Sequence, residues 1–371
     1  MKILHTVQRY APDTGGSEEV VKQISEYLVS WGHDVTVVAR PTPRRDFREL
    51  NGVKIVEFDC DGNAVEGIRG EGEAFRDFVR HFDGDVMMNY AAQIWSSDLV
   101  FDLLPSLRMK KVLVPCGYSR LHDPFFADYF KAMPEVLRQY DKVIYLSNDY
   151  IDTEFGREHH LQNGIVIPNG ADRREFRGDR KGRFRKRFSL GERPVILNVS
   201  NHSTLKGHDF FWRCIRQLHD LDVAPVLIGN PYVSWWKKWL KDCYTECRIS
   251  ARREGAVLLE GFHRDGLIDA YVDADIFLFG SKVECSPLVM FEAFASKTLF
   301  VTTDCGNVKD YDDVVCVVRS EEDALQIVRE YIANPARYAQ RINRGYQLFQ
   351  ESLNWESIAR RYESLYRGLA S

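Results

Sequence analysis

The sequence lacks any apolar run long enough to cross a membrane, since no such stretch approaches about 18 residues. It also lacks an excess of either charge, because 50 Lys and Arg stand against 54 Asp and Glu, for a net charge of −4. This balance gives no support to nucleic-acid binding, which favours a strongly basic domain. The first residues, MKILHTV, run directly into a strand pattern, so we expect no signal peptide and a cytoplasmic protein.

Cysteine is sparse and scattered. The closest pair among the eight cysteines is Cys243 and Cys247, and no further metal ligands stand beside it at a characteristic spacing. We therefore expect reduced thiols, several of them in core segments. The histidines also show no metal-ligand spacing with cysteines or carboxylates, so the sequence predicts no metal site.

What the sequence does contain is a regular alternation of strand and helix patterns, which favours parallel sheets with helices on both faces. A polar stretch with nine basic residues between residues 173 and 187 separates two sets of such units. We therefore predict an α/β protein with two doubly wound Rossmann-like domains facing a central cleft. The N-terminal domain would span residues 1–175, with a C-terminal helix over 352–371 packing back on it. The C-terminal domain would span residues 176–351.

The segment ECSPLVMFEA (residues 284–293) places two glutamates around a mostly apolar run. It follows DIFLFG, which is typical of a buried strand. Ser286 is predicted as the N-cap of a helix and Pro287 as its first residue. Glu284 would lie in the loop and Glu292 in the second helical turn, near free N–H groups that attract an anion such as a phosphate. A glutamate near a helix start also has a purely structural interpretation, because the helix dipole favours it.

Six segments occur in a recognisable order. They are PDTGGSEEVV (12–21), SWGHDVTVV (30–38), IPNGAD (167–172), LKGHDF (205–210), ECSPLVMFEA (284–293) and CGNVKDY (305–311). Together they resemble the retaining nucleotide-sugar glycosyltransferases of family 4, which have the GT-B fold. The resemblance implies transfer of a sugar from a nucleoside diphosphate to an acceptor hydroxyl, without a metal, in glycan, glycolipid or natural-product biosynthesis.

The resemblance also implies roles for individual residues. Glu284 matches a glutamate beside the donor sugar, and Lys206 matches a lysine that neutralises the diphosphate; these two are the predicted catalytic residues. Glu292 matches the glutamate that holds the ribose hydroxyls. The predicted donor site comprises Gly15, Gly16, Asn201, Lys206, Phe262, Glu284, Ser286, Pro287, Leu288 and Glu292.

Two departures from the family pattern concern the phosphate contact and the acceptor side. Asn201 stands where an arginine is usual, five residues before the lysine, with His202 beside it. The usual histidine after the strand DVMMNY is missing, and VPCGY replaces a frequent His-Gly pair. The acceptor side is predicted at Asn89, Tyr90, Gln93, Cys116 and Gly117, where the sequence departs in part from the family pattern.

These departures keep two alternatives open: a GT-B enzyme that epimerises or hydrolyses its nucleotide sugar, and a sugar-nucleotide-binding protein with weakened catalysis. The expected partners are a nucleotide-sugar donor and a glycan, lipid-linked or small-molecule acceptor. The basic residues 173–187 are interpreted as a solvated linker and helix, or as a peripheral contact with the inner face of a membrane. The tryptophans of SWWKKWLKDC (234–243) are interpreted as a packing face, or as an exposed patch.

Overall fold

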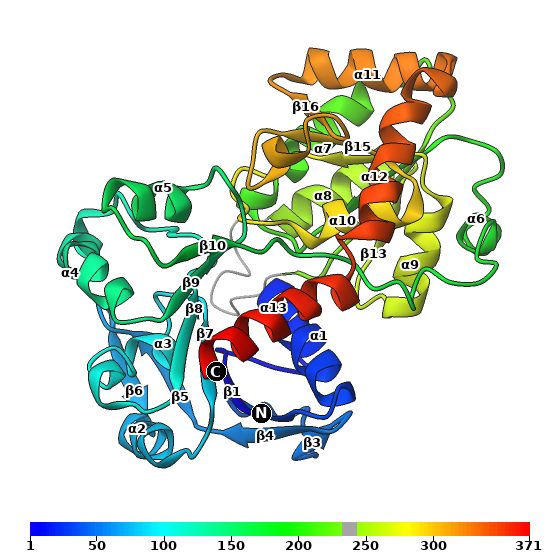
Figure 1. Cartoon of the computed structure of the whole chain (residues 1–371). Helices are drawn as coiled ribbons and strands as arrows, with labels where there is room; N and C mark the ends of the chain where they lie inside the picture. The colour runs from blue at the N-terminus through cyan, green and yellow to red at the C-terminus, as the bar shows by residue number, and fades with distance from the viewer. Residues whose placement is uncertain (232–242) are drawn as a thin grey trace. The chain divides into compact units, whose positions relative to one another are not determined.

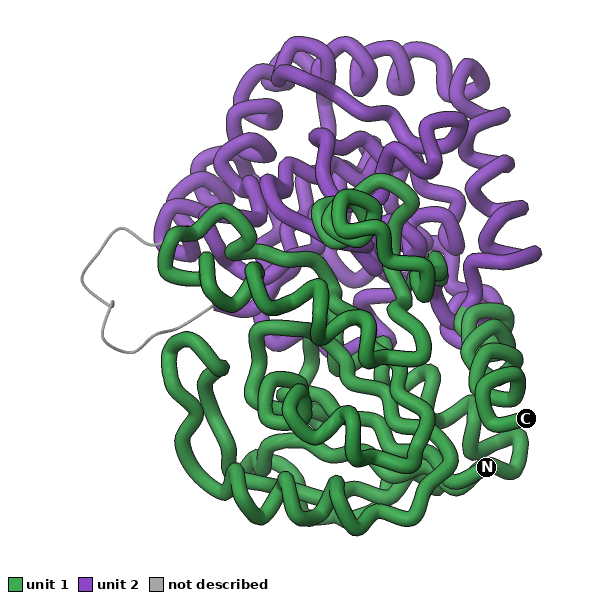
Figure 2. Tube along the Cα trace, turned by 60° about the vertical axis from the view of Figure 1, so that its left-hand side comes forward, with its two compact units in different colours: residues 1–169, 355–371 green, residues 170–354 purple. Residues whose placement is uncertain are grey.

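The computed structural model describes residues 1–231 and 243–371 of the chain. Two compact units divide it, one of residues 1–169 and 355–371 and the other of residues 170–354 (Figure 2). Both units are α/β sheets with mainly parallel strands, so the predicted fold class is confirmed. The tryptophans at 235, 236 and 239 lie outside the described residues. Within the described residues, no helix combines the length and apolar character needed to span a membrane.

Unit 1 is built on an eight-stranded sheet in the order β10-β9-β8-β7-β1-β2-β4-β3 (Figure 1). The pairs are parallel except β3 with β4. The strand order reverses between β1 and β7, and such a switch point is where α/β sheets bind ligands. The strands are β1 (Lys2–Thr6), β2 (Asp34–Ala39), β3 (Glu49–Leu50), β4 (Val53–Glu57), β7 (Val86–Tyr90), β8 (Lys110–Val114), β9 (Lys142–Tyr145) and β10 (Gly164–Val166), with a separate hairpin of β5 (Cys60–Asn63) and β6 (Gly67–Gly70).

The helices of unit 1 include one from the end of the chain. They are α1 (Gly16–Ser30), α2 (Gly72–His81), α3 (Trp95–Asp98), α4 (Ala127–Arg138), α5 (Ile151–Glu158) and α13 (Trp355–Ala370), with 3-10 turns η1 (Leu104–Ser106) and η2 (Pro124–Phe126). Two polar pairs hold α13 against the rest of unit 1. His33 Nε2, in the turn before β2, lies 2.9 Å from Glu363 Oε1, and His5 Nε2, in β1, lies 3.2 Å from Tyr366 Oη. The last helix therefore belongs to the first half of the chain.

Unit 2 is built on a six-stranded parallel sheet in the order β13-β12-β11-β14-β15-β16. Its strand order reverses between β11 and β14. The strands are β11 (Val195–Val199), β12 (Ala224–Ile228), β13 (Val257–Leu259), β14 (Ile276–Phe279), β15 (Leu299–Thr303) and β16 (Cys316–Val318). The helices are α6 (Arg183–Arg187), α7 (His208–Arg216), α8 (Cys243–Arg253), α9 (Arg264–Asp273), α10 (Leu288–Ser296), α11 (Glu321–Ala333) and α12 (Ala339–Glu351), with 3-10 turns η3 (Thr204–Lys206), η5 (Val308–Tyr311) and η6 (Pro335–Tyr338).

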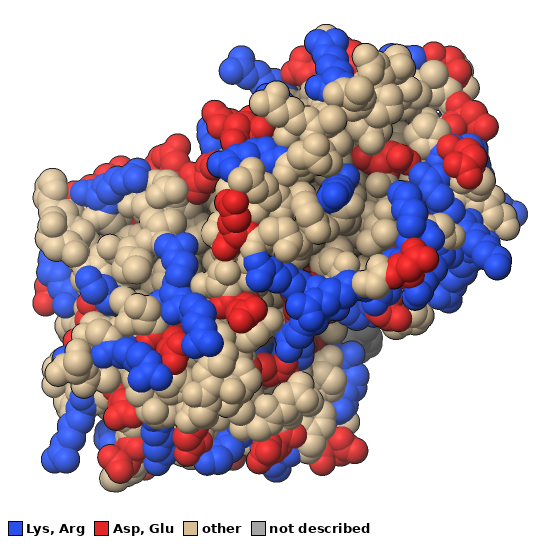
Figure 3. Space-filling view, turned by 45° about the vertical axis from the view of Figure 1, so that its right-hand side comes forward, with Lys and Arg blue, Asp and Glu red and all other residues tan. Residues whose placement is uncertain are grey.

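The basic stretch 173–187 packs on unit 2 more closely than a solvated linker does. Arg180 contacts Asp265 at 2.7 Å, and Arg185 contacts Asp275 at 2.6 Å. Both arginine side chains are only 14% exposed, so the solvated-linker interpretation is wrong for them. Figure 3 shows basic and acidic side chains interspersed over much of the drawn face.

The cysteines follow the prediction in one respect and depart from it in another. All eight are unpaired thiols, as expected. The expectation that Cys243 and Cys247 have no metal-ligand neighbours is wrong, because they lie beside His202 and His208 with all four ligand atoms within 4.8 Å of one another. The loop after β11 supplies His202, the start of α7 supplies His208 and helix α8 supplies the cysteines. Spacing along the sequence does not reveal this proximity.

Candidate functional site

Unit 2 brings two loops into contact at the carboxyl edge of its sheet. One follows β11 and the other follows β14, the two neighbouring strands at the switch point. Gly207 has a φ of +63°, and a Cβ added there would lie 1.7 Å from the carbonyl oxygen of Gly280. Only glycine allows this backbone conformation and this close approach together. The contact carries Lys206, the preceding residue, toward the loop that holds Glu284.

Lys206 and Glu284, the two predicted catalytic residues, form an ion pair. Lys206 Nζ lies 2.6 Å from Glu284 Oε1, and Ser281 Oγ donates to the same oxygen at 2.8 Å. The lysine side chain is 32% exposed and the glutamate side chain 14%. The ammonium group therefore compensates a half-buried carboxylate and keeps an open side that a second anion can contact. Sequence reasoning missed Ser281, although it comes just after the predicted strand.

Helix α10 begins directly after this loop. Pro287 is the N-cap residue, with φ −68° and ψ 120°, so the helix starts at Leu288. The prediction of Ser286 as N-cap and Pro287 as first helical residue was thus wrong by one position, because ψ of 120° is extended. Ser286 Oγ instead accepts a hydrogen bond from Asn307 Nδ2 at 3.0 Å. In the first helical turn, the Met290 N–H donates to Pro287 O at 3.1 Å. The N–H groups of Leu288 and Val289 come before any acceptor within the helix, which suits a phosphate.

A third loop, which follows β15, packs against the first two. Gly306 has a φ of +59°, and a Cβ there would lie 2.8 Å from the carbonyl oxygen of Cys285 and 3.1 Å from Glu284 Cβ. The glycine of the CGNVKDY segment therefore lets the chain pass closely over the glutamate. Three segments that the sequence singled out, LKGHDF, ECSPLVMFEA and CGNVKDY, meet at one edge of the sheet.

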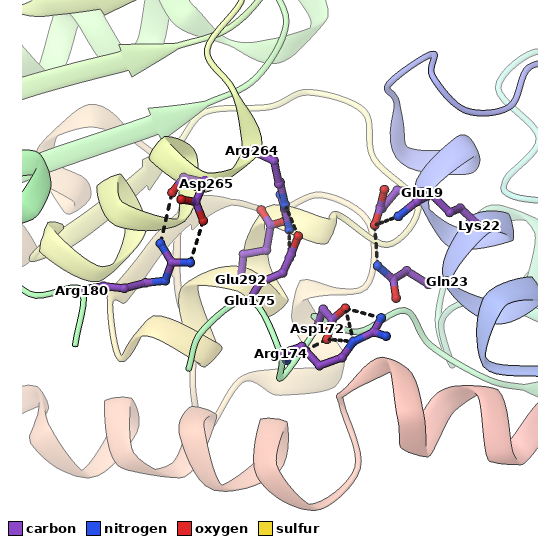
Figure 4. Close-up of polar contacts among 10 residues, drawn as sticks. All are labelled: Glu19, Lys22, Gln23, Asp172, Arg174, Glu175, Arg180, Arg264, Asp265 and Glu292. Atoms are coloured by element: carbon purple, nitrogen blue, oxygen red, sulfur yellow. Dashed lines mark hydrogen bonds and ion pairs between the residues drawn. The ribbon is translucent and has the colours of Figure 1, made fainter. Parts of the chain in front are cut away.

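Glu292 lies in the second turn of α10 and is already paired. Arg264 Nη1 lies 2.6 Å from Glu292 Oε1, and the same guanidinium binds Glu175 at 2.6 and 2.8 Å (Figure 4). The glutamate is 5% exposed. Burial raises the pKa of Glu292, and the charge of Arg264 opposes this shift. Sequence reasoning missed Arg264, which lies at the start of α9 and gave no motif signal.

The remaining donor-site candidates in unit 2 lie at the same sheet edge. Asn201 follows β11 and is exposed, and its Oδ1 accepts a long hydrogen bond of 3.3 Å from Asn230 N. Phe262 follows β13 and is half-buried, with its ring stacked on His263 at 5.2 Å. Arg187 lies over the same phenyl ring, 5.1 Å from its centre. Asn201 thus has room for a larger side chain, and Phe262 is held by its neighbours.

The predicted glycines of unit 1 lie at the start of α1, where Gly15 is the N-cap and Gly16 the first helical residue. A Cβ at Gly15 would lie 2.3 Å from Glu18 Oε2, whereas a Cβ at Gly16 would meet nothing within 4 Å in this unit. Arg9 Nε binds the other oxygen of Glu18 at 2.9 Å. A side chain at position 15 would thus clash with the Glu18 carboxylate, which explains the glycine there by packing alone. Gly16 presents open backbone.

Asn89 and Tyr90 end β7, at the switch point of the sheet in unit 1, and both side chains are buried, at 0% and 1% exposure. Asn89 Nδ2 donates to Thr6 Oγ1 at 2.8 Å, and Asn89 Oδ1 accepts from Tyr140 Oη at 2.9 Å. The structure places Asn89 in a polar network inside unit 1. It does not present this side chain to a ligand.

Gln93, Cys116 and Gly117 lie in the loops after β7 and β8. All three have positive φ, of 62°, 61° and 80°. For the two residues with side chains this conformation costs of order 1 kcal/mol or more, and such strain often accompanies functional sites. The Gly117 N–H donates to Asp152 Oδ2 at 2.9 Å, and burial raises the pKa of Asp152 to about 6. Of the acceptor-side candidates, these three loop residues have the backbone most suggestive of function.

Sequence comparison with known proteins gives independent support for the candidate site in unit 2. Residues 193–345, which include all the unit 2 candidates, match the family described as glycosyl transferases group 1. A GDP-mannose-dependent α-(1-6)-phosphatidylinositol monomannoside mannosyltransferase of Mycobacterium tuberculosis is 25% identical over 54% of this chain. The match spans only 55% of the length of that relative. A D-inositol 3-phosphate glycosyltransferase of Corynebacterium urealyticum is 23% identical over 96% of this chain and 91% of its own length.

A solved structure shows the same fold over the entire chain. The Anabaena protein Alr3699/HepE in complex with UDP-glucose superposes with a TM-score of 0.78 at 14% identity, covering 99% of this chain and 100% of that chain. At this identity the likeness concerns the fold alone. It shows that the chain has the GT-B fold, and residues 193–345 of unit 2 are similar to the group 1 glycosyl transferases.

Proposed function

We propose that this protein transfers a sugar from a nucleoside diphosphate donor to an acceptor hydroxyl with retention at the anomeric carbon. The observation that carries the proposal is the Lys206–Glu284 ion pair beside the first turn of α10. It lies at the switch point of the sheet in unit 2, which would be the donor domain. The ammonium group of Lys206 is partly exposed, and the helix N-terminus supplies N–H donors. A diphosphate bound between them would therefore contact positive charge from both groups.

Departure of the diphosphate is the demanding step of such a reaction, because the electron pair of the breaking C–O bond stays on the leaving oxygen. Lys206 and the N–H groups at the start of α10 would stabilise this growing charge. These groups take the place of a divalent metal. Glu284 would accept hydrogen bonds from the donor sugar and orient it, without forming a covalent bond to it.

Glu292 would bind the ribose hydroxyls of the donor. A carboxylate accepts hydrogen bonds from two adjacent hydroxyls well. In the free protein Arg264 binds Glu292 Oε1. When the donor binds, the carboxylate would therefore have to contact both the Arg264 guanidinium and the ribose hydroxyls. Arg264 also holds Glu175, and it therefore keeps a counter-charge if Glu292 turns toward the ribose.

The names of two relatives and the ligand of one solved structure support a more specific proposal for the donor and the acceptor. The two relatives are named for GDP-mannose or inositol phosphate chemistry, and the Anabaena structure contains UDP-glucose. We therefore propose a hexose bound to GDP or UDP as donor, and a hydroxyl of a glycan, a lipid-linked molecule or a small molecule such as an inositol phosphate as acceptor. Contact of residues 173–187 with an anionic membrane surface remains a prediction.

The direct test is thermal unfolding with a panel of nucleotide sugars, because a bound donor raises the melting temperature according to its occupancy. The donor that stabilises is then incubated with candidate acceptors, and NMR of the product gives its anomeric configuration. A product with the donor's configuration supports retention, and an inverted one contradicts it. Hydrolysis or epimerisation of the donor, with no transfer to any acceptor, would replace the proposal by the alternative.

Sugar transfer is expected to proceed without added Mg²⁺ or Mn²⁺ and to survive brief treatment with EDTA. The reason is that an ammonium group and a helix N-terminus already face the proposed diphosphate position. Turnover is measured with EDTA and after return of each cation. Loss of activity that Mg²⁺ or Mn²⁺ restores would contradict the prediction. Loss that only Zn²⁺ restores would point to the histidine–cysteine cluster discussed below.

Asn201→Arg is expected to strengthen donor binding by about 1–2 kcal/mol, because it adds a cation near the diphosphate. Asn201 is exposed, and among the described residues its side chain makes one long hydrogen bond, so a larger side chain can extend toward solvent. Titration calorimetry with the preferred donor measures the effect, and Asn201→Gln serves as the uncharged control. Equal affinities of the two variants would show that position 201 does not face the phosphates.

A further inference from the structure

The loop between β11 and α7 has a second cluster on it, separate from the Lys206–Glu284 pair. Four side chains meet there: His202 and His208 from the loop and the start of α7, and Cys243 and Cys247 from one face of α8. Three of the four are buried and Cys243 is half-buried. A pocket of about 390 Å³ adjoins the cluster, with His208 and both cysteines in its wall.

The hydrogen bonds around His208 determine which ring nitrogen is free. Asn198 Nδ2 donates to Leu278 O at 2.8 Å, so Asn198 Oδ1 is the acceptor for the Ser200 hydroxyl, also at 2.8 Å. Ser200 Oγ has then donated its proton and accepts from His208 Nε2 at 2.8 Å. The proton of this imidazole therefore sits on Nε2.

His208 Nδ1 consequently points an unprotonated lone pair into the cluster. It lies 3.2 Å from Cys243 Sγ and 3.3 Å from Cys247 Sγ. This is the state in which a histidine binds a metal: one nitrogen is bare, and the other is held by an outer hydrogen bond that fixes the ring.

His202 provides the second, independent observation. It is 4% exposed, and neither of its ring nitrogens makes a hydrogen bond of standard geometry within the described residues, although the Cys243 thiol lies beside the ring. A buried imidazole without a well-formed hydrogen bond is destabilising, so such groups are rare in folded proteins and call for an explanation. Its ring centre lies 4.9 Å from that of His208. A shared metal would satisfy both imidazoles.

We propose that His202, His208, Cys243 and Cys247 bind a single Zn²⁺ ion that ties the loop after β11 to helix α8. Two thiolates and two imidazoles are a set that favours tetrahedral zinc over magnesium, calcium or manganese, which prefer oxygen ligands. Zn–S distances of about 2.3 Å and Zn–N distances of about 2.0–2.1 Å bring ligand atoms to within about 3.3–3.8 Å of one another. The four atoms here already lie within 4.8 Å, so small side-chain movements complete the shell.

A disulfide between the two cysteines explains the cluster less well. Residues four apart on a helix have Cβ atoms about 5–6 Å apart, whereas a disulfide needs about 3.5–4.5 Å. It would also leave His202 and the Nδ1 atom of His208 without a ligand to bind. Trp212 Nε1 lies 3.2 Å from Cys247 Sγ, and such an N–H donor supports a thiolate bound to a metal.

The zinc would be structural, with a consequence for the loop that carries it. Four protein ligands close the tetrahedron and leave no position for a substrate. The pinned loop runs from residue 200 to residue 207 and includes Asn201 and Lys206. Zinc would thus fix the position of the loop that carries Asn201 and Lys206, which belongs to the proposed donor site, without itself contacting the donor.

The test is a Co²⁺ titration of the full chain, reduced and then stripped with a chelator, followed by absorption spectroscopy. We expect cobalt–thiolate charge-transfer bands and tetrahedral d–d bands that saturate at about one equivalent and disappear when Zn²⁺ is added. Cys243→Ser and His202→Gln should weaken or abolish them. Cys316→Ser and exposed His219→Gln, which change residues outside the cluster, should leave them intact. Absence of these bands, or their persistence in the cluster variants, would overturn the proposal.

A measurement on the wild-type chain covers the case in which a cluster variant fails to fold. Iodoacetamide labelling with peptide mass spectrometry gives the reactivity of each cysteine with and without Zn²⁺. Zinc should slow the labelling of Cys243 and Cys247 severalfold and leave that of Cys116 unchanged. Equal labelling of the α8 cysteines in both conditions would overturn the proposal.

Discussion

Lys206→Ala is expected to lower kcat/KM for sugar transfer by about 10²–10³-fold, the usual effect of removing one donor that stabilises developing negative charge. Lys206 is the cation beside Glu284 and the first turn of α10. Charge on the diphosphate grows as its bond to the sugar breaks, so the loss should appear in kcat as well as in donor affinity. Steady-state kinetics and donor titration of the same preparation measure both quantities.

Lys297→Ala is the matched control for this variant. Lys297 lies just after the opposite end of α10 and contacts the ring of Tyr346, with Nζ 4.4 Å from its centre. The Lys297→Ala substitution removes one lysine from the same unit and does not change the proposed phosphate position. If Lys206→Ala keeps wild-type turnover and donor affinity, the phosphate site lies elsewhere. If the two lysine variants lose activity equally, the loss reflects charge or folding and not a phosphate contact.

Glu292→Gln is expected to weaken donor binding by about 10- to 150-fold and to change kcat much less. A hydrogen bond to a charged group contributes about 1.5–3 kcal/mol, and the proposed ribose hydroxyls take no part in the reaction. Gln keeps the size of the side chain, and Arg264 keeps Glu175 as an ionic partner. Titration calorimetry gives the affinity, and turnover at saturating donor gives kcat.

Glu175→Gln provides the control, because Glu175 binds the same guanidinium but has no proposed contact with the donor. Its effect on donor affinity should be much smaller. A larger loss in Glu175→Gln than in Glu292→Gln would mean that Arg264 itself, and not the α10 glutamate, contacts the nucleotide.

The raised pKa of Glu292 predicts that the stability of the protein depends on pH in a particular direction. Its folded-state pKa lies above the unfolded value, because burial disfavours the charged form. The native state therefore loses stability as pH rises from the unfolded pKa through the folded one, and above that range the cost of the buried carboxylate is fully present. Relative to wild type, Glu292→Gln should gain in melting temperature over the same pH rise. A difference that does not change with pH would show that the carboxylate is not destabilised by burial.

The alternation of strands and helices in the sequence was sufficient to predict two doubly wound sheets, because each βα unit shows its own local pattern. The same local signals placed Glu284 in a loop and Glu292 on a helix. The helix start was off by one residue, since proline suits both the N-cap and the first turn, and only the observed ψ of 120° at Pro287 decides between them.

Contacts between distant segments limited the rest of the prediction. From the sequence, Asn89 is a polar residue at the end of a strand and thus a candidate for ligand binding. In the structure its side chain is hydrogen-bonded to Thr6 and Tyr140 in a buried network. Arg264 binds Glu292 from another helix and belongs to no motif. The histidine–cysteine cluster joins residues more than 30 positions apart. Its one local signal was the spacing of two cysteines on one helical face.

The most direct test of the account is the affinity of the protein for a nucleoside diphosphate compared with that for the matching monophosphate. Calorimetry with GDP and GMP, and with UDP and UMP, measures it on the wild-type chain and on Lys206→Ala. The account predicts that the diphosphate of the preferred base binds about tenfold tighter or more, and that Lys206→Ala removes most of this difference. Equal affinities for the diphosphate and the monophosphate of both bases would contradict a phosphate site at Lys206 and the first turn of α10.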